Sequence, residues 1–357
     1  MISILHLQRD LGITNGITKY IYQLSKYSNK DFNHHVMALN CEASELFTKN
    51  SIPLTIFGFK KITPFNIIKI VKTIKKYLVK HQISIIHCHH RNFDTLCWLL
   101  NTYFRVHTVT TVQSKVYKYK IISYRSEKLI AIGESIKSHL VKYFHRNENR
   151  ITLLNNFTCE KEYDIYESST ITKHGLSLDK NKRVILFVGR FSKEKGIDLL
   201  LKAYKKIKMT GSNIALILLG SGEENNLVEK YHNDSTLEIK VIAPCFPIID
   251  YYRLADVVVL PSRVDPFPFV MLEAGYLSKP FIGTNVDGIG EVIENEINGL
   301  LVEPENENEL EKAILRILND EKQAAKFGSA LREKIVKSYT SKRIIPKYEQ
   351  LYKSLVV

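Results

Sequence analysis

The stretch Val184-Ile-Leu-Phe-Val-Gly-Arg-Phe-Ser-Lys-Glu-Lys-Gly196 decides the fold of this 357-residue chain. Its first five residues are apolar, which predicts a buried strand over Val184–Val188. Gly189 lets the backbone turn sharply where that strand ends, and the apolar spacing of Asp198–Ile207 predicts the helix that follows. A buried strand that leads through a short loop into a helix is the unit from which parallel sheets are built.

The same alternation of strand and helix runs through both halves of the chain. The expected strands are Ile2–Leu7, His35–Leu39, Ile83–His87, Val106–Val112, Lys128–Ile132, Val184–Val188, Ile214–Leu219, Ile239–Ile242, Val257–Leu260 and Pro280–Gly283. The expected helices are Ile17–Ser25, Pro64–Lys80, Thr95–Phe104, Asp198–Ile207, Asn225–Tyr231, Ile248–Leu254, Phe269–Leu277, Glu307–Asn319 and Ser341–Val357. Apolar strands that alternate with helices predict parallel sheets covered on both faces.

Length and pattern together predict two domains of the α/β class. A single hydrophobic core stops growing near roughly 250–300 residues, and this chain is longer. The strand–helix pattern lapses over Glu160–Lys182 before a fresh strand begins. We therefore expect one domain over residues 1–165, a second over residues 166–340, and an amphipathic closing helix over residues 341–357.

The formal net charge is +14, and the whole excess lies in the first half of the chain. Residues 1–160 contain 23 Lys and Arg against 9 Asp and Glu, whereas residues 161–357 contain 28 of each. A one-sided basic field favours an anionic partner, such as phosphates, an acidic glycan or a membrane surface. A lysine-rich surface that only keeps the protein in solution is the alternative.

The cysteines and the N-terminus indicate the compartment. Five scattered cysteines without a CxxC spacing fit a reducing environment rather than a disulfide framework. Met1–Leu7 lacks the basic region and the long apolar run of a signal peptide. No run approaches the roughly 18–20 apolar residues of a membrane-spanning helix. We therefore expect a cytoplasmic protein, with any membrane contact peripheral and on the inner face of the cell membrane.

Two basic stretches in the first half leave alternatives open. Asn66–Lys80 carries apolar residues at helical spacing with five lysines around them. This is typical either of an interfacial helix on anionic lipid or of a helix that packs on a sheet. Lys115-Val-Tyr-Lys-Tyr-Lys120 interleaves tyrosine and lysine after an expected strand. Such a segment suits an acceptor with phosphate or lipid character, and it also suits single-stranded nucleic acid.

Two acids, Asp265 and Glu273, flank the start of the helix expected at Phe269. Ligands of parallel α/β sheets bind outside the carboxyl ends of the strands, where the loop of Asp265 is expected. The first amides of a helix that begins near Phe269 would offer a place for a phosphate. Glu273 could accept hydrogen bonds from a ribose diol, and Asp265 could hold sugar hydroxyls or oppose a developing positive charge. The alternative is a surface acid followed by an ordinary helix acid.

Two cations, Arg190 and Lys195, share the loop that follows the strand Val184–Val188. A guanidinium and an ammonium together suit a diphosphate leaving group, because its negative charge grows in the transition state. The position at the carboxyl end of a strand favours this interpretation over two exposed surface cations.

These motifs occur in a fixed order along the second half. They are Val188–Gly196, Leu219-Gly-Ser-Gly-Glu223, Ala255-Asp-Val257, Leu260-Pro-Ser262, the two spaced acids, and Asn298-Gly-Leu-Leu-Val302. Together they resemble the retaining family-4 glycosyltransferases of the GT-B fold over nearly all of residues 184–305. The first half matches more loosely, through Asn15-Gly-Ile-Thr-Lys19 and His87-Cys-His89.

The resemblance implies two Rossmann-like domains that face each other across a cleft, with the closing helix crossing back to the first domain. The first domain would receive a glycan or a lipid-linked saccharide acceptor, in the assembly of a bacterial surface polysaccharide. The second would bind a nucleoside-diphosphate sugar, whose sugar is transferred with retention and without a cofactor or metal. An anionic membrane surface is a further candidate partner, and nucleic acid is not expected.

The resemblance also assigns roles position by position. Arg190 and Lys195 would bind the donor diphosphate, and Glu273 would hold the ribose. Asp265 would contact the transferred sugar and, with His89, is a candidate catalytic residue. The remaining donor-side positions are Gly16, where the first domain approaches the donor, Gly220 and Ala243–Cys245 beside the nucleobase, and the amides of Phe269 and Val270 on sugar hydroxyls and phosphate.

Three positions depart from the family pattern. Asp265 is one methylene shorter than the usual glutamate, Pro268 replaces a glycine and has no N–H to donate, and Gln113 stands where relatives often have a histidine. That role is then vacant or is filled by His89. His87 and His89 would share one face of a strand, which suits metal chelation, but hydrogen bonding to a sugar is the preferred interpretation.

Two other functions remain open at this point. A nucleotide-sugar epimerase of similar fold would need no acceptor and would isomerise the donor alone. A non-catalytic basic module would bind a membrane or nucleic acid and keep only a degenerate donor site. The presence of Arg190, Lys195 and Glu273 favours transfer, whereas Pro268 and Gln113 favour the module.

Overall fold

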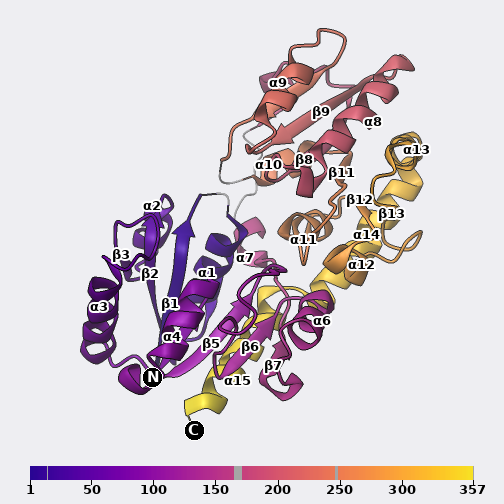
Figure 1. Cartoon of the computed structure of the whole chain (residues 1–357). Helices are drawn as coiled ribbons and strands as arrows, with labels where there is room; N and C mark the ends of the chain where they lie inside the picture. Colours follow the sequence, from indigo (N-terminus) through magenta and orange to yellow (C-terminus); the bar gives the residue numbers. More distant parts are fainter. Residues whose placement is uncertain (14, 165–170, 246–247, 357) are drawn as a thin grey trace. The chain divides into compact units, whose positions relative to one another are not determined.

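The computed structural model describes residues 1–13, 15–164, 171–245 and 248–356. The chain divides into two compact units (Figure 1). Unit 1 comprises Met1–Asn156 together with Ser341–Val357, and unit 2 comprises Phe157–Thr340. The domain boundary expected between residues 165 and 166 lies outside the described residues and stays a prediction.

Unit 1 is built on a parallel sheet of seven strands in the order β3-β2-β1-β4-β5-β6-β7. Each neighbouring pair is parallel, and β1 lies between β2 and β4. The strands are β1 Ile2–Leu11, β2 Phe32–Cys41, β3 Leu54–Ile56, β4 Ile85–Cys88, β5 His107–Val112, β6 Lys128–Ala131 and β7 Ile151–Leu153. All four residues of β4 are buried, because helices cover both faces of a parallel sheet.

The helices of unit 1 lie around this sheet (Figure 1). They are α1 Gly16–Tyr27, α2 Ser44–Thr48, α3 Ile67–Lys80, α4 Arg91–Leu99, α5 Asn101–Phe104, α6 Glu134–Lys142 and α15 Ser341–Val356. Helix α3 contributes Ile70, Ile74 and Leu78 to one core cluster. Helix α15 contacts α1 and β1, so the expected return of the closing helix to the first domain is confirmed.

Unit 2 has a parallel sheet of six strands in the order β10-β9-β8-β11-β12-β13. The strands are β8 Arg183–Val188, β9 Ile214–Leu219, β10 Ile239–Ile242, β11 Val257–Leu260, β12 Phe281–Thr284 and β13 Leu300–Val302. The helices are α7 Glu160–Asp164, α8 Ile197–Met209, α9 Asn225–His232, α10 Ile249–Leu254, α11 Phe269–Tyr276, α12 Asp287–Val292, α13 Glu307–Asn319 and α14 Glu321–Ser338. The predicted class, α/β with two Rossmann-like parallel sheets, is confirmed.

One expected helix is divided in the structure. The segment Thr95–Phe104 belongs to two helices, α4 and α5, which meet at Leu100. The backbone of Leu100 has φ −110° and ψ 17°, outside the α-helical region, so the helical hydrogen-bond ladder is interrupted there. Among the described residues, no helix is long and apolar enough to cross a membrane.

Glycines allow the loops at the carboxyl edge of the second sheet to touch. A Cβ on Gly196, which has φ 69°, would lie 1.9 Å from the carbonyl oxygen of Pro261 in the next loop. A Cβ on Gly220, which has φ 154°, would lie 1.9 Å from the carbonyl oxygen of Gly189. No side chain fits at these distances, so glycine is required at both positions.

We predict that Gly196→Ala destabilises the protein more than Gly211→Ala. Gly211 has a similar φ of 77° but no atom within 4 Å of the site of a Cβ, so it controls for backbone strain alone. That strain costs about 1–2 kcal/mol, and the clash at Gly196 adds about 1–3 kcal/mol. Urea unfolding followed by circular dichroism measures both losses, and equal losses would show that the loops need not touch.

Candidate functional site

Three loops of unit 2 meet at the carboxyl edge of its sheet, after β8, β9 and β11. The amide of Phe191 donates to the carbonyl of Ser221 at 3.0 Å, which joins the first two loops. The amide of Arg263 donates to the carbonyl of Glu194 at 2.7 Å, which joins the first and the third. Arg190 and Lys195 on the first loop and Asp265 on the third therefore lie on loops that are joined by backbone hydrogen bonds. This is the edge at which parallel α/β sheets bind ligands.

The structure pairs Lys195 with Asp265. The Lys195 Nζ donates to Asp265 Oδ2 at 2.6 Å, and the carboxylate is buried while the ammonium is partly exposed. Ser262 Oγ donates to the same carboxylate oxygen at 3.3 Å. A buried carboxylate that accepts hydrogen bonds from an ammonium and a hydroxyl is held in one position. Asp265 thus orients the predicted diphosphate-binding lysine, a link between the two residues that their separate motifs did not indicate.

Arg190 stands at the surface of the same loop. Its side chain is 53% exposed, with Nη2 2.8 Å from Glu194 Oε2 and Nη1 3.7 Å from Glu223 Oε1. Exposed ion pairs of this kind contribute little to stability, about 0–1 kcal/mol. A phosphate could therefore replace either carboxylate at small cost, and the guanidinium is available for bidentate binding.

Glu273 lies inside α11 and is buried. The hydroxyl of Tyr252, on α10, donates to Glu273 Oε2 at 2.5 Å. Burial and the neighbouring carboxylate raise the pKa of Tyr252 well above its usual value, so this phenol keeps its proton and remains a donor. Tyr252 could not be predicted as the partner of Glu273, because no motif spacing connects residues on two different helices.

Helix α11 begins at Phe269, directly after Pro268, as expected. Pro268 has extended backbone angles and makes no side-chain cap. Next to it, the amide of Gly288 donates to the carbonyl of Asp265 at 3.2 Å, and the amide of Asp265 lies 3.3 Å from Asp287 Oδ2. The start of α12 therefore braces the loop of Asp265. Asp287 was not among the predicted site residues, although Val286-Asp-Gly288 follows a strand and is typical of such a loop.

The predicted residues of the first half belong to unit 1. Gly16 is the first residue of α1, whose N-cap Asn15 accepts a hydrogen bond from the amide of Ile17. His89 follows β4 and is buried. The roles predicted for Gly16, Gly220, Ala243–Cys245 and His89 in binding or catalysis stay predictions.

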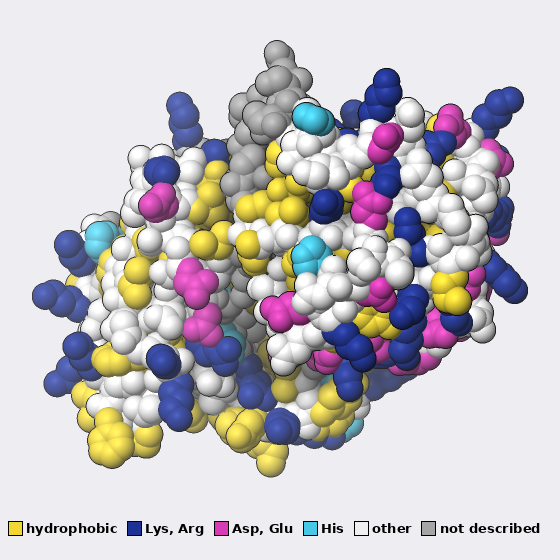
Figure 2. Space-filling model, turned by 90° about the horizontal axis from the view of Figure 1, so that it is seen from above, with side chains coloured by type: hydrophobic (Ala, Val, Ile, Leu, Met, Phe, Trp, Pro, Cys, Tyr) yellow, Lys and Arg dark blue, Asp and Glu magenta, His cyan; other side chains and the backbone are white. Residues whose placement is uncertain are grey.

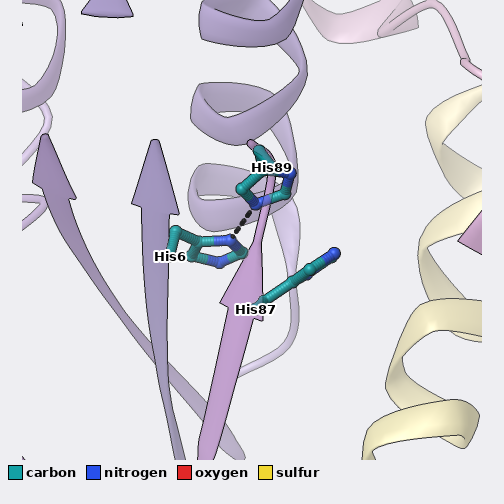
Figure 3. A group of neighbouring side chains, drawn as sticks. All are labelled: His6, His87 and His89. Carbon is teal, nitrogen blue, oxygen red and sulfur yellow. Dashed lines mark hydrogen bonds between the residues drawn. The ribbon is translucent and has the colours of Figure 1, made fainter. Parts of the chain in front are cut away.

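His89 belongs to a buried chain of imidazoles (Figure 3). His6 lies on β1, and its Nδ1 is 2.8 Å from His89 Nε2 while its Nε2 is 2.8 Å from His34 Nδ1. His87, on β4, is hydrogen bonded to the Tyr352 hydroxyl and to Thr111 Oγ1, each at 2.7 Å. Neutral imidazoles suit such a chain because each offers one donor and one acceptor.

Ring nitrogens of His6, His87 and His89 lie within 4.8 Å of one another, the arrangement that a metal ion would require. Both ring nitrogens of His6 and both of His87 already take part in hydrogen bonds. A metal ion would have to displace at least two of these bonds in a buried place. The expectation of a metal-independent protein is therefore kept as a prediction.

Comparison with known families decides what the chain is. The model "Glycosyl transferases group 1" matches residues 169–334, and "Glycosyltransferase Family 4" matches residues 14–158. The chain belongs to the family-4 glycosyltransferases. The family inferred from the motifs Val188–Gly196 and Asp265–Glu273 is thereby confirmed.

Several curated proteins are similar to this glycosyltransferase. MJ1607 of Methanocaldococcus jannaschii is 31% identical over 56% of the chain and 52% of its own length. The capsular polysaccharide biosynthesis glycosyltransferase CapM of Staphylococcus aureus is 29% identical over 66% of the chain and 64% of its own length. The chain thus spans about half to two thirds of these two relatives. UDP-Gal:alpha-D-GlcNAc-diphosphoundecaprenol alpha-1,3-galactosyltransferase of Escherichia coli is 25% identical over 87% of the chain and 89% of its own length.

Solved structures match over the whole length. A glycosyltransferase from Rickettsia africae has a TM-score of 0.84 at 20% identity and covers 99% of this chain and 98% of its own. Anabaena Alr3699/HepE, solved with UDP-glucose, has a TM-score of 0.85 at 18% identity and covers 99% and 100%. At these identities the likeness shows the fold, and the GT-B fold expected for this glycosyltransferase is confirmed.

We predict that unit 1 loses stability on acidification through its buried histidines. Burial lowers the pKa of His6, His87 and His89, and lowers that of His34 to about 3. The unfolded chain titrates near its ordinary value of about 6.5. It therefore binds more protons below that pH, and each such histidine costs about 1.4 kcal/mol of stability per pH unit between about 6.5 and its folded pKa.

The fluorescence of Trp98, the one tryptophan, measures this transition because it lies in unit 1. The free energy of unfolding, measured in urea, should have its highest value above pH 6.5 and fall steadily from pH 6.5 to pH 5. His34→Gln should make the dependence on pH shallower by about one proton, whereas His145→Gln, at an exposed position, should not. The same slope in both variants would contradict the prediction.

Proposed function

We propose that this glycosyltransferase transfers a sugar with retention from a nucleoside-diphosphate sugar to a glycan or lipid-linked saccharide, in the assembly of a bacterial surface polysaccharide. The family supports the reaction, and the names of the Staphylococcus aureus and Escherichia coli relatives support the pathway and the lipid-linked acceptor. In this proposal the enzyme is cytoplasmic and meets such an acceptor at the membrane surface.

The observation that carries the proposal is the pair of cations on the loop after β8. Arg190 and Lys195 lie five residues apart at the carboxyl edge of the sheet, one at the surface and one beside a buried carboxylate. In the transfer, the anomeric carbon exchanges its bond to the diphosphate oxygen for a bond to an acceptor hydroxyl oxygen. The electron pair of the broken bond stays on the departing diphosphate, and the acceptor hydroxyl gives up its proton. The two cations of this loop stabilise the growing negative charge, so the proposed transfer needs no metal.

Asp265 has two tasks in this proposal. Its bond to Lys195 keeps the ammonium oriented before the donor arrives, so that little ordering is required on binding. Its carboxylate also stands ready for the transferred sugar, the role that the family pattern implies. The shorter side chain, compared with the usual glutamate, agrees with a carboxylate drawn close to Lys195.

Glu273 is proposed to hold the ribose. Tyr252 fixes one of its carboxylate oxygens through a strong buried hydrogen bond. A carboxylate held in this way cannot rotate freely, and its geometry is set before a ribose diol approaches. Tyr252 is thus a positioning residue for the donor site.

The two rival functions make different demands. An epimerase would convert the donor without any acceptor. A non-catalytic basic module would tolerate loss of the donor site. In this chain, however, Lys195 is hydrogen bonded to Asp265, and Tyr252 is hydrogen bonded to Glu273. We therefore favour transfer over both.

We predict that one nucleoside diphosphate binds unit 2 through these residues. In a thermal-shift panel of UDP, GDP, ADP, CMP and NAD, one diphosphate at about 100 times its Kd should stabilise the protein by about 2.7 kcal/mol. Loss of one charged hydrogen bond in Arg190→Ala, Lys195→Ala or Glu273→Ala costs about 1.5–3 kcal/mol. The Kd should therefore rise by about 10- to 100-fold.

Lys193→Ala is the matched control, because Lys193 is an exposed cation on the same loop. It should leave the Kd within about twofold of the original protein. Equal losses in Lys193→Ala and Lys195→Ala would indicate a general charge effect rather than a site. Conversion of the donor without acceptor into an isomer would favour the epimerase instead.

A further inference from the structure

One stretch of unit 1 combines positive charge with exposed apolar side chains. Between Glu45 and Glu127 the chain contains fourteen Lys and Arg and a single acid, Asp94, which is buried. Of the nineteen large hydrophobic side chains exposed in the described part of the chain, eleven lie in the same stretch. Unit 1 as a whole holds 27 Lys and Arg against 9 Asp and Glu, a formal charge of +18, whereas unit 2 has −4. Exposed apolar side chains that form a contiguous patch mark interaction sites.

The exposed apolar residues on and beside helix α3 lie outside its buried stripe. Its inner stripe, Ile70, Ile74 and Leu78, is buried in the core. Phe65, just before the helix, is nevertheless 98% exposed, and Ile68 is 63% exposed. Lys72 and Lys76 continue this outer stripe at helical spacing and are also exposed. One face of the helix therefore packs in the core of unit 1, and a second face, which is basic and apolar, is exposed to solvent.

The outer face of α3 continues onto α5. Lys75 Nζ donates to the carbonyl of Tyr103 at 2.6 Å and lies 5.1 Å from the centre of its ring. The exposed Trp98 and Leu99 lie at the end of α4, directly before α5 in the chain. These contacts make α3, α4 and α5 neighbours on one surface.

The loop after β5 completes the surface. The Arg125 guanidinium lies 5.3 Å from the ring of Trp98, and its Nε donates to the carbonyl of Ile121 at 2.7 Å. Asp94 holds the loop in place by accepting the amides of Arg125 at 2.9 Å and Ser126 at 3.0 Å. The side chain of Ile121 is 75% exposed at this ordered position. The single acid of the stretch thus anchors the loop instead of neutralising its surface.

We propose that this surface, defined by Phe65, Ile68, Trp98, Leu99, Tyr103 and Ile121 and termed the basic apolar face, docks on an anionic lipid bilayer. Phe, Ile and Leu side chains enter the boundary between headgroups and acyl chains, and Trp and Tyr prefer that boundary. Each Lys or Arg near the surface contributes about 1 kcal/mol with anionic lipid. Figure 2 shows hydrophobic side chains projecting among Lys and Arg side chains along the lower left of the view.

Other occupants fit this chemistry less well. Single-stranded nucleic acid would stack on Trp98 and Tyr103, but it offers nothing to the aliphatic Ile68, Leu99 and Ile121. A second copy of the chain would bring two strongly basic surfaces together, and like charges disfavour that contact. A bilayer with anionic headgroups supplies both the negative charge and the apolar interior. The inference goes beyond the proposed transfer reaction and does not depend on it.

The test uses the full chain without donor at about 0.15 M salt, where the Debye length is about 8 Å. Vesicles of phosphatidylcholine alone are compared with vesicles containing 30% phosphatidylglycerol in a co-sedimentation assay. Binding should rise at least tenfold with the anionic lipid and fall again in high salt. Because Trp98 is the one tryptophan and lies in the face, its emission should shift to the blue on binding.

Matched variants separate the face from general surface effects. Phe65→Ser with Ile68→Ser should lower vesicle binding at least tenfold, whereas Met209→Ser with Ile297→Ser, two exposed apolar residues of unit 2, should not. Lys72→Glu with Lys76→Glu should lower it by a similar factor, whereas Lys230→Glu with Lys322→Glu, an equal change of net charge in unit 2, should have less effect.

Several outcomes would overturn the proposal. They are equal binding to both kinds of vesicle, no shift of the Trp98 emission, equal losses in the face and control variants, or binding to a single-stranded oligonucleotide without binding to vesicles. Nucleoside diphosphate binding is measured in the same variants and should be unchanged. Failure of vesicle binding with intact nucleotide binding would reject the docking face alone, and the reverse would reject the donor site alone.

Discussion

Backbone packed against backbone at the carboxyl edge of the second sheet is the constraint on which the proposed donor site depends. Gly196 brings the loop after β8 onto Pro261 so closely that no Cβ fits, and Lys195 is thereby set 2.6 Å from Asp265. Gly220 brings the loop after β9 onto Gly189 in the same way. The charged side chains of these loops start from fixed backbones, so the site is largely organised before any ligand binds.

The two units divide the physical tasks. Unit 2 has a nearly balanced charge and keeps its few functional charges paired, as Lys195 is with Asp265. Unit 1 carries the basic excess on its outside and a chain of neutral imidazoles inside, centred on His6. A buried imidazole chain is stable only while uncharged, since burial disfavours the protonated form. The excess of positive charge in the first half is therefore a property of the surface of unit 1, and the donor site does not account for it.

Much of the fold could be predicted because its strands are short apolar runs between clear breaks. Ile214–Leu219, Ile239–Ile242 and Val257–Leu260 have the expected bounds. The strands β3, β7 and β13 were missed, since a strand of three residues is too short for its apolar pattern to stand out. In the site, the position of each motif on its strand end could be predicted, but its partners could not. The bond of Tyr252 to Glu273 and the chain from His34 through His6 to His89 join distant segments, and only the tertiary structure brings them together.

The central claim is that a nucleoside diphosphate binds at the carboxyl edge of the second sheet, on the loop between Gly189 and Gly196. A crystal structure of the chain with the nucleoside diphosphate that binds most tightly tests it most directly. The account predicts diphosphate oxygens within hydrogen-bonding distance of Arg190 and Lys195, with the ribose hydroxyls on Glu273. A diphosphate bound elsewhere, with Lys195 still paired to Asp265 alone, would contradict it.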